Sequence, residues 1–166
     1  HIVPAVSDNG FKPEIAASVL TTVMLAGAIG RLCSGKLCDT IGPLQTYAMM
    51  SLGQTCLVIS FPHMASLTSI YVLAAVFGFF FSGVMSSMII CVNYMVPAEV
   101  AARSWATVSL FAWIGMGLGS YMGGALFDMT GGYTWSFAFA AIMGCGNLAV
   151  LLAYHFNGGR REPVLA

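Results

Sequence analysis

Arg31 is the strongest candidate in this sequence for a residue that binds a ligand, because of its charge and its position. It lies inside a long apolar run, eight residues before Asp39, which in a helix corresponds to about 12 Å. A guanidinium at that depth in a membrane is costly unless it reaches the headgroups, pairs with an acid or faces water. Three interpretations are open: contact with the cytoplasmic headgroups, a gate pair with Asp39 or Glu99, or binding of an anion in a cavity. We favour the third, because guanidinium binds a carboxylate through two parallel hydrogen bonds.

Aromatic residues of later apolar runs are the second candidate feature. Phe77, Phe81 and Met85 recur every four residues and therefore share one face of a helix, and Trp113 stands in the next run. Packing inside the protein is the commoner role of such residues, and lining a substrate cavity is the alternative. We therefore take Phe77, Phe81 and Trp113 as candidate substrate-binding residues.

Glycines at four-residue spacing form the third feature. Gly115, Gly119 and Gly123 line one face of a helix, and Gly78 and Ser82 repeat the spacing in an earlier run. A face without side chains lets a second helix approach closely. The spacing predicts helix packing at these positions, either static or with helices that slide against each other.

Patterns that indicate enzymes are missing from the sequence. It contains no His-x-x-x-His pair, no Gly-x-Ser-x-Gly and no phosphate-binding glycine loop. The five cysteines never form Cys-x-x-Cys, and most of them stand in apolar runs. We therefore expect no enzyme, no cofactor and no metal site.

The distribution of charge identifies the surroundings of these residues. Charged residues make up 7% of the chain and hydrophobic residues 58%, whereas about 25% of a soluble domain is charged. No Asp, Glu, Lys or Arg occurs within residues 40–98, 104–127 or 129–159. Apolar runs longer than about 18 residues indicate membrane spans. The chain is therefore expected to lie in a lipid bilayer, and the lack of a basic run excludes nucleic acid as a partner.

Turn residues and charges divide the chain into five apolar segments of one membrane domain covering residues 1–166. The expected spans are residues 14–37, 44–61, 69–96, 104–127 and 133–156. The third is 28 residues long, about 42 Å as a helix, so it must tilt, kink or protrude from a hydrocarbon core of about 30 Å. The polar segment 97–103 is expected to be a loop.

Basic residues orient these spans. Five of the six lie on one side: Arg31, Lys36, Arg103, Arg160 and Arg161. Because basic residues favour the cytoplasmic side, this side is expected to be cytoplasmic. The segment 1–12 is then outside, and the tail 158–166 is inside.

The segment between the first two spans carries a family resemblance. Its pattern Gly35-x-Leu37-x-Asp39-x-x-Gly42 resembles the signature loop of the major facilitator superfamily, which recurs in each six-helix half. Arg31, shortly before it, makes the chain similar to the branch of monocarboxylate transporters and oxalate/formate antiporters. The segments 97–103 and 124–133 resemble the family's loops after its tenth and eleventh helices.

The resemblance implies a fold and a missing partner. The five spans would be helices eight to twelve, most of the C-terminal six-helix bundle of an all-α membrane protein. The chain starts without Met in a loop-like segment, so we expect that it has been cut from a longer protein whose N-terminal half is missing.

The resemblance also assigns roles to residues. Arg31 would contact the carboxylate of the substrate. The signature loop with Gly35, Asp39 and Gly42, together with Glu99 and Arg103 of the later loop, would form the cytoplasmic gate, and Asn93 and Tyr94 are weaker gate candidates. Helices eight, ten and eleven would line the cavity. Helices nine and twelve would support it from outside, so Gln54 and Asn147 would bond to neighbouring helices.

Three departures from the family pattern limit these expectations. Thr40 replaces the usual basic residue, which weakens locking of the loop by charge, and Gly27 replaces an acidic residue, which argues against proton coupling there. The fourth span has no lysine, so a clamp of two cations for a dicarboxylate is not supported.

The expected function is therefore secondary active transport by alternating access in the plasma membrane. The expected substrate is a small organic anion, a monocarboxylate, moved with a proton or by exchange. A transporter for a sugar, drug or other metabolite, or a membrane scaffold that transports nothing, remains the alternative.

Overall fold

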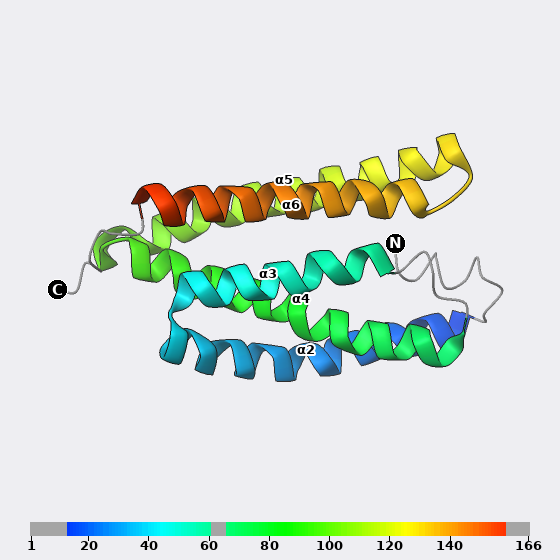
Figure 1. Ribbon diagram of the computed structural model, residues 1–166, viewed down its shortest axis with the longest axis horizontal. Coiled ribbons are helices and arrows are strands. Elements are labelled where there is room, and N and C mark those ends of the chain that lie inside the picture. The colour runs from blue at the N-terminus through cyan, green and yellow to red at the C-terminus, as the bar shows by residue number, and fades with distance from the viewer. Residues whose placement is uncertain (1–12, 61–65, 159–166) are drawn as a thin grey trace.

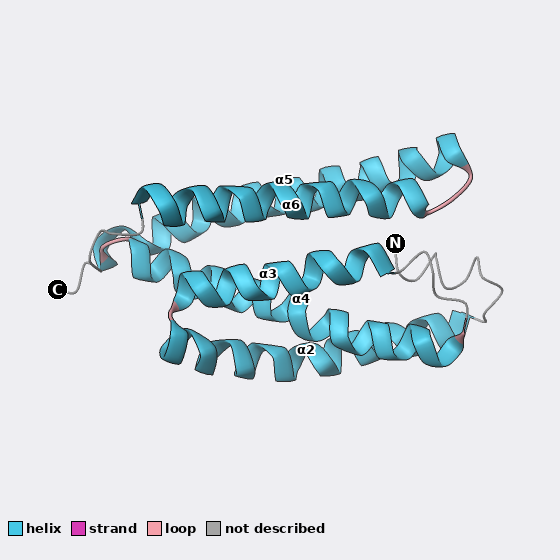
Figure 2. Cartoon of the chain, in the orientation of Figure 1, coloured by secondary structure: helices cyan, strands magenta, loops and turns pink. Residues whose placement is uncertain are grey.

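The computed structural model describes residues 13–60 and 66–158 of the chain. Almost all of these residues are helical, and no strand occurs among them (Figure 2). The helices are α2 (Pro13–Ile41), α3 (Pro43–Ser60), α4 (Leu67–Met95), α5 (Ala98–Thr130) and α6 (Thr134–Gly158). The expectation of an all-α protein is confirmed.

The five helices lie side by side along a common direction (Figure 1). α4 packs against both α2 and α3, α3 also packs against α6, and α5 packs mainly against α6. We call the end of the bundle where α2 joins α3 and α4 joins α5 the Gly42 end. The end where α5 joins α6 is the Gly131 end (Figure 1).

Two glycines make the tight turns between consecutive helices. Gly42 has φ +95° and donates its N–H to the Cys38 carbonyl at 3.1 Å. Gly131 has φ +67° and donates its N–H to the Phe127 carbonyl at 2.8 Å. Both backbones are left-handed, a conformation that glycine adopts without a steric cost, so each residue ends its helix and reverses the chain.

The start of α5 corrects the expectation of a loop over residues 97–103. Pro97 precedes the helix, and α5 begins at Ala98 with the acidic Glu99 in its first turn. A carboxylate there is favourable for the helix dipole, and alanines 101 and 102 have the highest helix propensity. These local preferences outweigh the polarity that suggested a loop. Glu99 and Arg103 therefore lie on a helix, not in a linker.

Four of the described helices, α2, α4, α5 and α6, are long and apolar enough to cross a membrane. α3 has 18 residues, about 27 Å, and carries Gln45 and Gln54. It runs back from the Gly42 end toward the start of α4 (Figure 1). Its crossing of the membrane, and hence the fifth span, stays a prediction.

The buried core lies between α2, α3 and α4. Ala16 and Val19 of α2 and Ala74 of α4 are fully buried in one cluster, and Met50 of α3 is almost fully buried. In α5, Gly123 is the buried residue. The three helices α2, α3 and α4 therefore form the packed part of the described chain, and α5 contributes little to it.

Candidate functional site

Arg31 lies within α2, ten residues before the end of this helix at Ile41, a distance of about 15 Å. Its side chain is exposed. Its carbonyl accepts a hydrogen bond from the Ser34 hydroxyl at 3.0 Å, but among residues 13–60 and 66–158 no side chain pairs with its guanidinium. In this conformation neither Asp39 nor Glu99 forms the gate pair that the sequence left open.

Beside Arg31, α2 and α4 touch through their backbones. A Cβ atom added to Gly30 would lie 2.1 Å from the carbonyl oxygen of Phe79, and one added to Gly78 would lie 2.3 Å from that of Val23. A Cβ on Gly27 would meet the Ser82 hydroxyl at 2.3 Å. At Gly30 and Gly78 the obstructing atoms belong to the backbone, so a larger residue would displace the opposite helix, whereas at Gly27 the obstructing atom is a side-chain hydroxyl. The contact therefore brings the two backbones together directly beside Arg31.

Nearer the Gly131 end, a polar contact adds to the α2–α4 interface. The hydroxyls of Ser18 and Tyr71 form a hydrogen bond between the two helices. Ala16, Val19 and Ile70 are buried next to it. The α2–α4 interface thus combines close glycine contacts beside Arg31 with a hydrogen bond and apolar packing nearer the Gly131 end.

Phe77 and Phe81 remain together on α4, as their spacing predicts. Their rings are stacked with centroids 5.8 Å apart, and both side chains are half-buried. Trp113 lies on α5 and is 71% exposed. Because α5 packs mainly against α6, the described chain does not assemble Arg31, the two phenylalanines and Trp113 into one closed site.

The predicted glycine face of α5 is used only at one end. Gly123 is buried, and its carbonyl accepts a hydrogen bond from the Ser136 hydroxyl of α6 at 2.7 Å. A Cβ added to Gly115 or Gly119 would meet no atom within 4 Å. Gly123 therefore contacts α6, whereas Gly115 and Gly119 face no helix of the described chain, and a role of this glycine face in helix packing stays a prediction.

The predicted gate residues gather at the Gly42 end. Gly42 makes the turn, and its carbonyl accepts hydrogen bonds from both the N–H and the hydroxyl of Thr46, at 3.1 and 2.9 Å. Asp39 lies in the last turn of α2 and is exposed, as are Glu99 and Arg103. Gly35 has open space around its Cα. No ion pair links these charged groups within the described ranges.

A polar cluster between α3 and α6 was predicted only in part. Asn147 accepts a hydrogen bond from the Tyr47 hydroxyl at 3.1 Å and donates one to the Ser51 hydroxyl at 2.7 Å. The expectation of bonds to a neighbouring helix is confirmed for Asn147 but is wrong for Gln54, which makes no hydrogen bond within the described residues. Its partners could not be predicted, because they lie about a hundred residues away in sequence. The signal available was the position of Asn147 as an amide inside an apolar run.

Close contacts of Gly53 and Gly144 were also missed. A Cβ on Gly53 would lie 2.4 Å from the Phe80 ring, and one on Gly144 would lie 2.4 Å from the Thr55 hydroxyl. Neither glycine belongs to the set at four-residue spacing, Gly115, Gly119 and Gly123, for which the sequence predicted helix packing. The signal would have been an isolated glycine inside an apolar helix, which lowers helix stability unless it permits a close contact.

Side chains that could hold a metal ion are scattered. The five cysteines are free thiols, with Cys38 and Cys91 buried. No group of three or more His, Cys, Asp or Glu side chains occurs in the described part of the chain. Among the described residues, the strongest candidate for binding a ligand is the unpaired guanidinium of Arg31, next to the tightly packed pair of helices α2 and α4.

The sequence is similar to that of known proteins. The family model of the Major Facilitator Superfamily matches residues 2–164. Monocarboxylate transporter 13 of Rattus norvegicus is 28% identical over 159 residues, and that of Bos taurus is 28% identical over 164 residues. Each alignment covers 94% of this chain and 37% of the relative, so the chain spans little more than a third of these relatives' length. Because the family model matches nearly every residue, the chain belongs to the Major Facilitator Superfamily.

Proposed function

We propose that this chain is part of a secondary transporter that moves a small organic anion, a monocarboxylate, across the plasma membrane. The chain would be the second half of the protein, and a missing first half would complete the cavity. In such folds a site near the midplane is exposed to each side in turn. Membership of the family supports transport, and the names of the two relatives support the class of substrate.

The observation that carries the proposal is the unpaired guanidinium of Arg31. It stands about 15 Å from the Gly42 end of α2, and no described carboxylate neutralises it. An uncompensated charge inside a membrane is costly unless it reaches the headgroups, faces water or binds an anion, and a bound anion is the alternative that gives Arg31 a role in transport. A monocarboxylate offers two oxygens that match the guanidinium. Phe77, Phe81 and Trp113 would contact the apolar part of the substrate.

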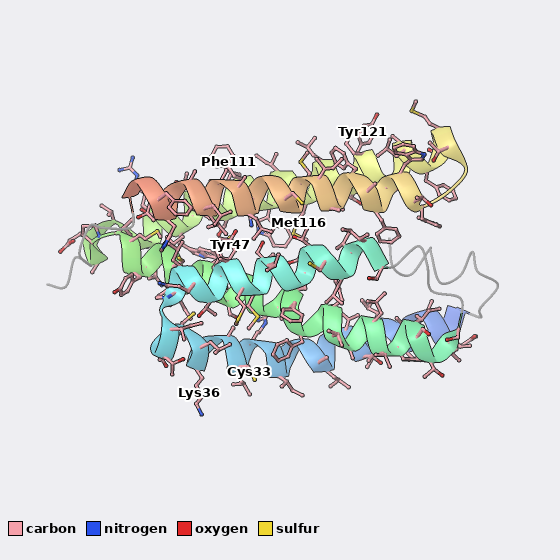
Figure 3. All side chains as sticks on the ribbon, in the orientation of Figure 1. Cys33, Lys36, Tyr47, Phe111, Met116 and Tyr121 are labelled. Atoms are coloured by element: carbon pink, nitrogen blue, oxygen red, sulfur yellow. The ribbon has the colours of Figure 1, made fainter. Side chains whose placement is uncertain are left out.

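The orientation follows from the basic residues. Lys36 lies on α2 near the Gly42 end and points away from the bundle (Figure 3). Arg103 lies in the second turn of α5 at the same end. Because basic residues favour the cytoplasm, we assign the Gly42 end to the cytoplasmic side. Gly35, Asp39, Gly42, Glu99 and Arg103 would then act at the inner gate.

Uptake by the full-length protein with Arg31→Gln or Arg31→Lys tests the role of Arg31. Labelled lactate, pyruvate and acetate are supplied to cells that carry the protein at the surface. We expect uptake to fall by at least about 30-fold in Arg31→Gln, which corresponds to about 2 kcal/mol for loss of one partner of a desolvated charge pair. Arg31→Lys should also be defective, because an ammonium cannot form the bidentate contact.

Lys36→Gln is the matched control. It removes a positive charge from the same helix, but from a side chain that points away from the bundle (Figure 3), so uptake should stay within about twofold of the unmodified protein. Surface labelling checks that all variants reach the membrane. Undiminished uptake of every carboxylate in Arg31→Gln would refute the anion-binding role.

A competition panel separates the solute classes. Monocarboxylates should inhibit uptake, whereas sugars and cationic drugs should not. Uptake that responds to an imposed pH gradient indicates coupling to a proton, and uptake that needs an anion on the opposite side indicates exchange. Inhibition by a sugar or a drug but by no carboxylate would assign the protein to another class of solute.

A further inference from the structure

The midpoints of α2 and α4 meet at a contact between Gly27 and Ser82. Gly27 is fourteen residues from either end of α2, and Ser82 lies fifteen residues after Leu67 and thirteen before Met95 in α4. A Cβ atom added to Gly27 would overlap the Ser82 hydroxyl, so this hydroxyl occupies the space that the glycine leaves free. In transporters with such folds the substrate site lies near the middle of the membrane, which is where the midpoints of two spanning helices fall.

Arg31 is placed to reach this contact. It lies one turn after Gly27, on the same face of α2. Long side chains on a helix lean back over the preceding turn, so we expect the side chain of Arg31 to extend over Gly27 toward the Ser82 hydroxyl. No side chain on Gly27 obstructs this path. The guanidinium and the hydroxyl form no hydrogen bond with each other among the described residues, so both can bind a third group.

The Ser82 hydroxyl has no hydrogen-bond partner within residues 13–60 and 66–158. A serine inside a helix commonly bonds to the carbonyl one turn back, as Ser87 of the same helix does to Gly83 at 2.7 Å. Ser82 is half-buried, and its oxygen is accessible, in contrast to the sealed and unpartnered hydroxyl of Ser109. An unpaired hydroxyl away from water is costly, and a ligand that accepts a hydrogen bond would remove this cost.

A carboxylate has more acceptor sites than one guanidinium can satisfy. Its two oxygens accept about four hydrogen bonds, and a bidentate contact with Arg31 uses two of them. A lone pair left without a donor in a site that excludes water would weaken binding. We propose that the Ser82 hydroxyl donates a hydrogen bond to the carboxylate that Arg31 binds, which makes Ser82 a substrate-binding residue. This inference rests on the proposed function of Arg31.

Uptake kinetics of the full-length protein with Ser82→Ala test this role. Labelled lactate, pyruvate and acetate are supplied at a series of concentrations to cells that carry the protein at the surface. We expect the half-saturating concentration of the transported anion to rise by about tenfold or more, as for loss of a hydrogen bond to a charged group. The maximal rate should not change, because the variant loses a bond that contributes to binding alone.

Ser87→Ala is the matched control. It removes a hydroxyl from the same helix, but this hydroxyl is fully buried and bonded to the backbone of α4 itself. The half-saturating concentration should therefore equal that of the unmodified protein. Surface labelling checks that each variant reaches the membrane in the same amount.

A double variant separates the hydroxyl from the packing around it. Gly27→Ser combined with Ser82→Ala moves the hydroxyl from α4 to the facing position on α2. The nearest remaining atoms would then lie 3.2 and 3.3 Å from the new Cβ, so the added side chain fits with small adjustments. We expect this variant to recover most of the lost affinity. Gly27→Ala combined with Ser82→Ala has similar packing without a hydroxyl, and it should remain as defective as Ser82→Ala.

Three outcomes would overturn the inference and leave the proposed function intact, provided that Arg31→Gln has lost uptake. The first is an unchanged half-saturating concentration in Ser82→Ala. The second is a fall in the maximal rate alone, which would indicate a structural role. The third is equal affinity of the two double variants, which would show that the hydroxyl itself contributes nothing. Undiminished uptake in Arg31→Gln would instead refute the proposed function, and this inference with it.

Discussion

The helix pairs α2–α4 and α5–α6 contain the same small residues but use them differently. Gly30 and Gly78 bring the backbones of α2 and α4 into contact. On α5, Gly115 and Gly119 stand at four-residue spacing in open space, and Phe111 and Tyr121 project away from the other helices (Figure 3). Glycine spacing thus shows where a second helix can approach closely. Whether one does depends on which other helices pack against that face.

The comparison separates a closely packed region, α2 to α4, from a region in which α5 presents small residues to no other helix of the described chain. α4 lies against both α2 and α3, so Gly27, Gly30 and Gly78 meet atoms of the facing helix. In the hairpin of α5 and α6, α3 packs against α6, whereas α5 has few contacts with any described helix other than α6. Substitutions with alanine distinguish the two regions, because an added methyl group is harmful only where an atom already occupies its place.

The largest effect is expected for Gly30→Ala. Its Cβ would lie 2.1 Å from the carbonyl oxygen of Phe79 and within 3 Å of two further backbone atoms of that residue. Backbone cannot rotate away, so α2 must move as a whole. We expect a loss of about 3 kcal/mol or more, at the upper end for overpacking, and a lower Tm in detergent.

Gly35→Ala is the control for this prediction. It lies on the same helix but has no neighbouring atom within 4 Å of an added Cβ, so its Tm should not fall. Unfolding can be followed as an increase in labelling by a thiol-reactive dye, because Cys38 and Cys91 are buried and become accessible when the helices separate, whereas the other three cysteines are already exposed. A Gly30→Ala protein as stable as Gly35→Ala would contradict the close contact of α2 and α4.

A smaller effect is expected for Gly144→Ala, where the obstacle is a side chain. The added Cβ would lie 2.4 Å from the Thr55 hydroxyl, and Thr55 can change its rotamer if it gives up the hydrogen bond to the Ser51 carbonyl. We expect a loss of about 1–2 kcal/mol. Gly146→Ala, two residues further on α6 and without a neighbour within 4 Å, should keep its Tm. Equal losses in the two variants would point to a general effect on α6.

These predictions show what the sequence could and could not provide. Apolar runs and turn residues were sufficient to predict the helices, because both signals are local. The packing of Gly30 on Phe79 and of Gly144 on Thr55 depends on residues from other helices, which no local pattern contains. The start of α5 was misplaced because polarity was given more weight than the helix propensity of residues 98–102. Arg31 was identified from its charge and depth alone, and its lack of a described partner required the structure.

A loss of about 1 kcal/mol is expected for Asn147→Leu. The change removes two hydrogen bonds between α3 and α6, to Tyr47 and Ser51, and such bonds contribute about 0.6 kcal/mol each within membranes. Gln54→Leu on α3 is the control, because the Gln54 amide has no described hydrogen-bond partner; its Tm should stay the same or rise. If Asn147→Leu were fully stable, the polar cluster would contribute nothing to holding α6 against α3.

Gly119→Ala is expected to have the smallest effect and tests the comparison most directly. With no atom within 4 Å of the added Cβ, the methyl group meets no helix of the described chain, and alanine favours the helix by up to about 1 kcal/mol. The Tm of the full-length protein should therefore stay the same or rise slightly, and Gly115→Ala should behave alike. A clear loss of stability in both variants would mean that a segment outside the described residues packs on this face in the intact protein. The glycines of α5 would then serve the same purpose as those of α2 and α4, and the difference between the two helix pairs would reflect the missing segment.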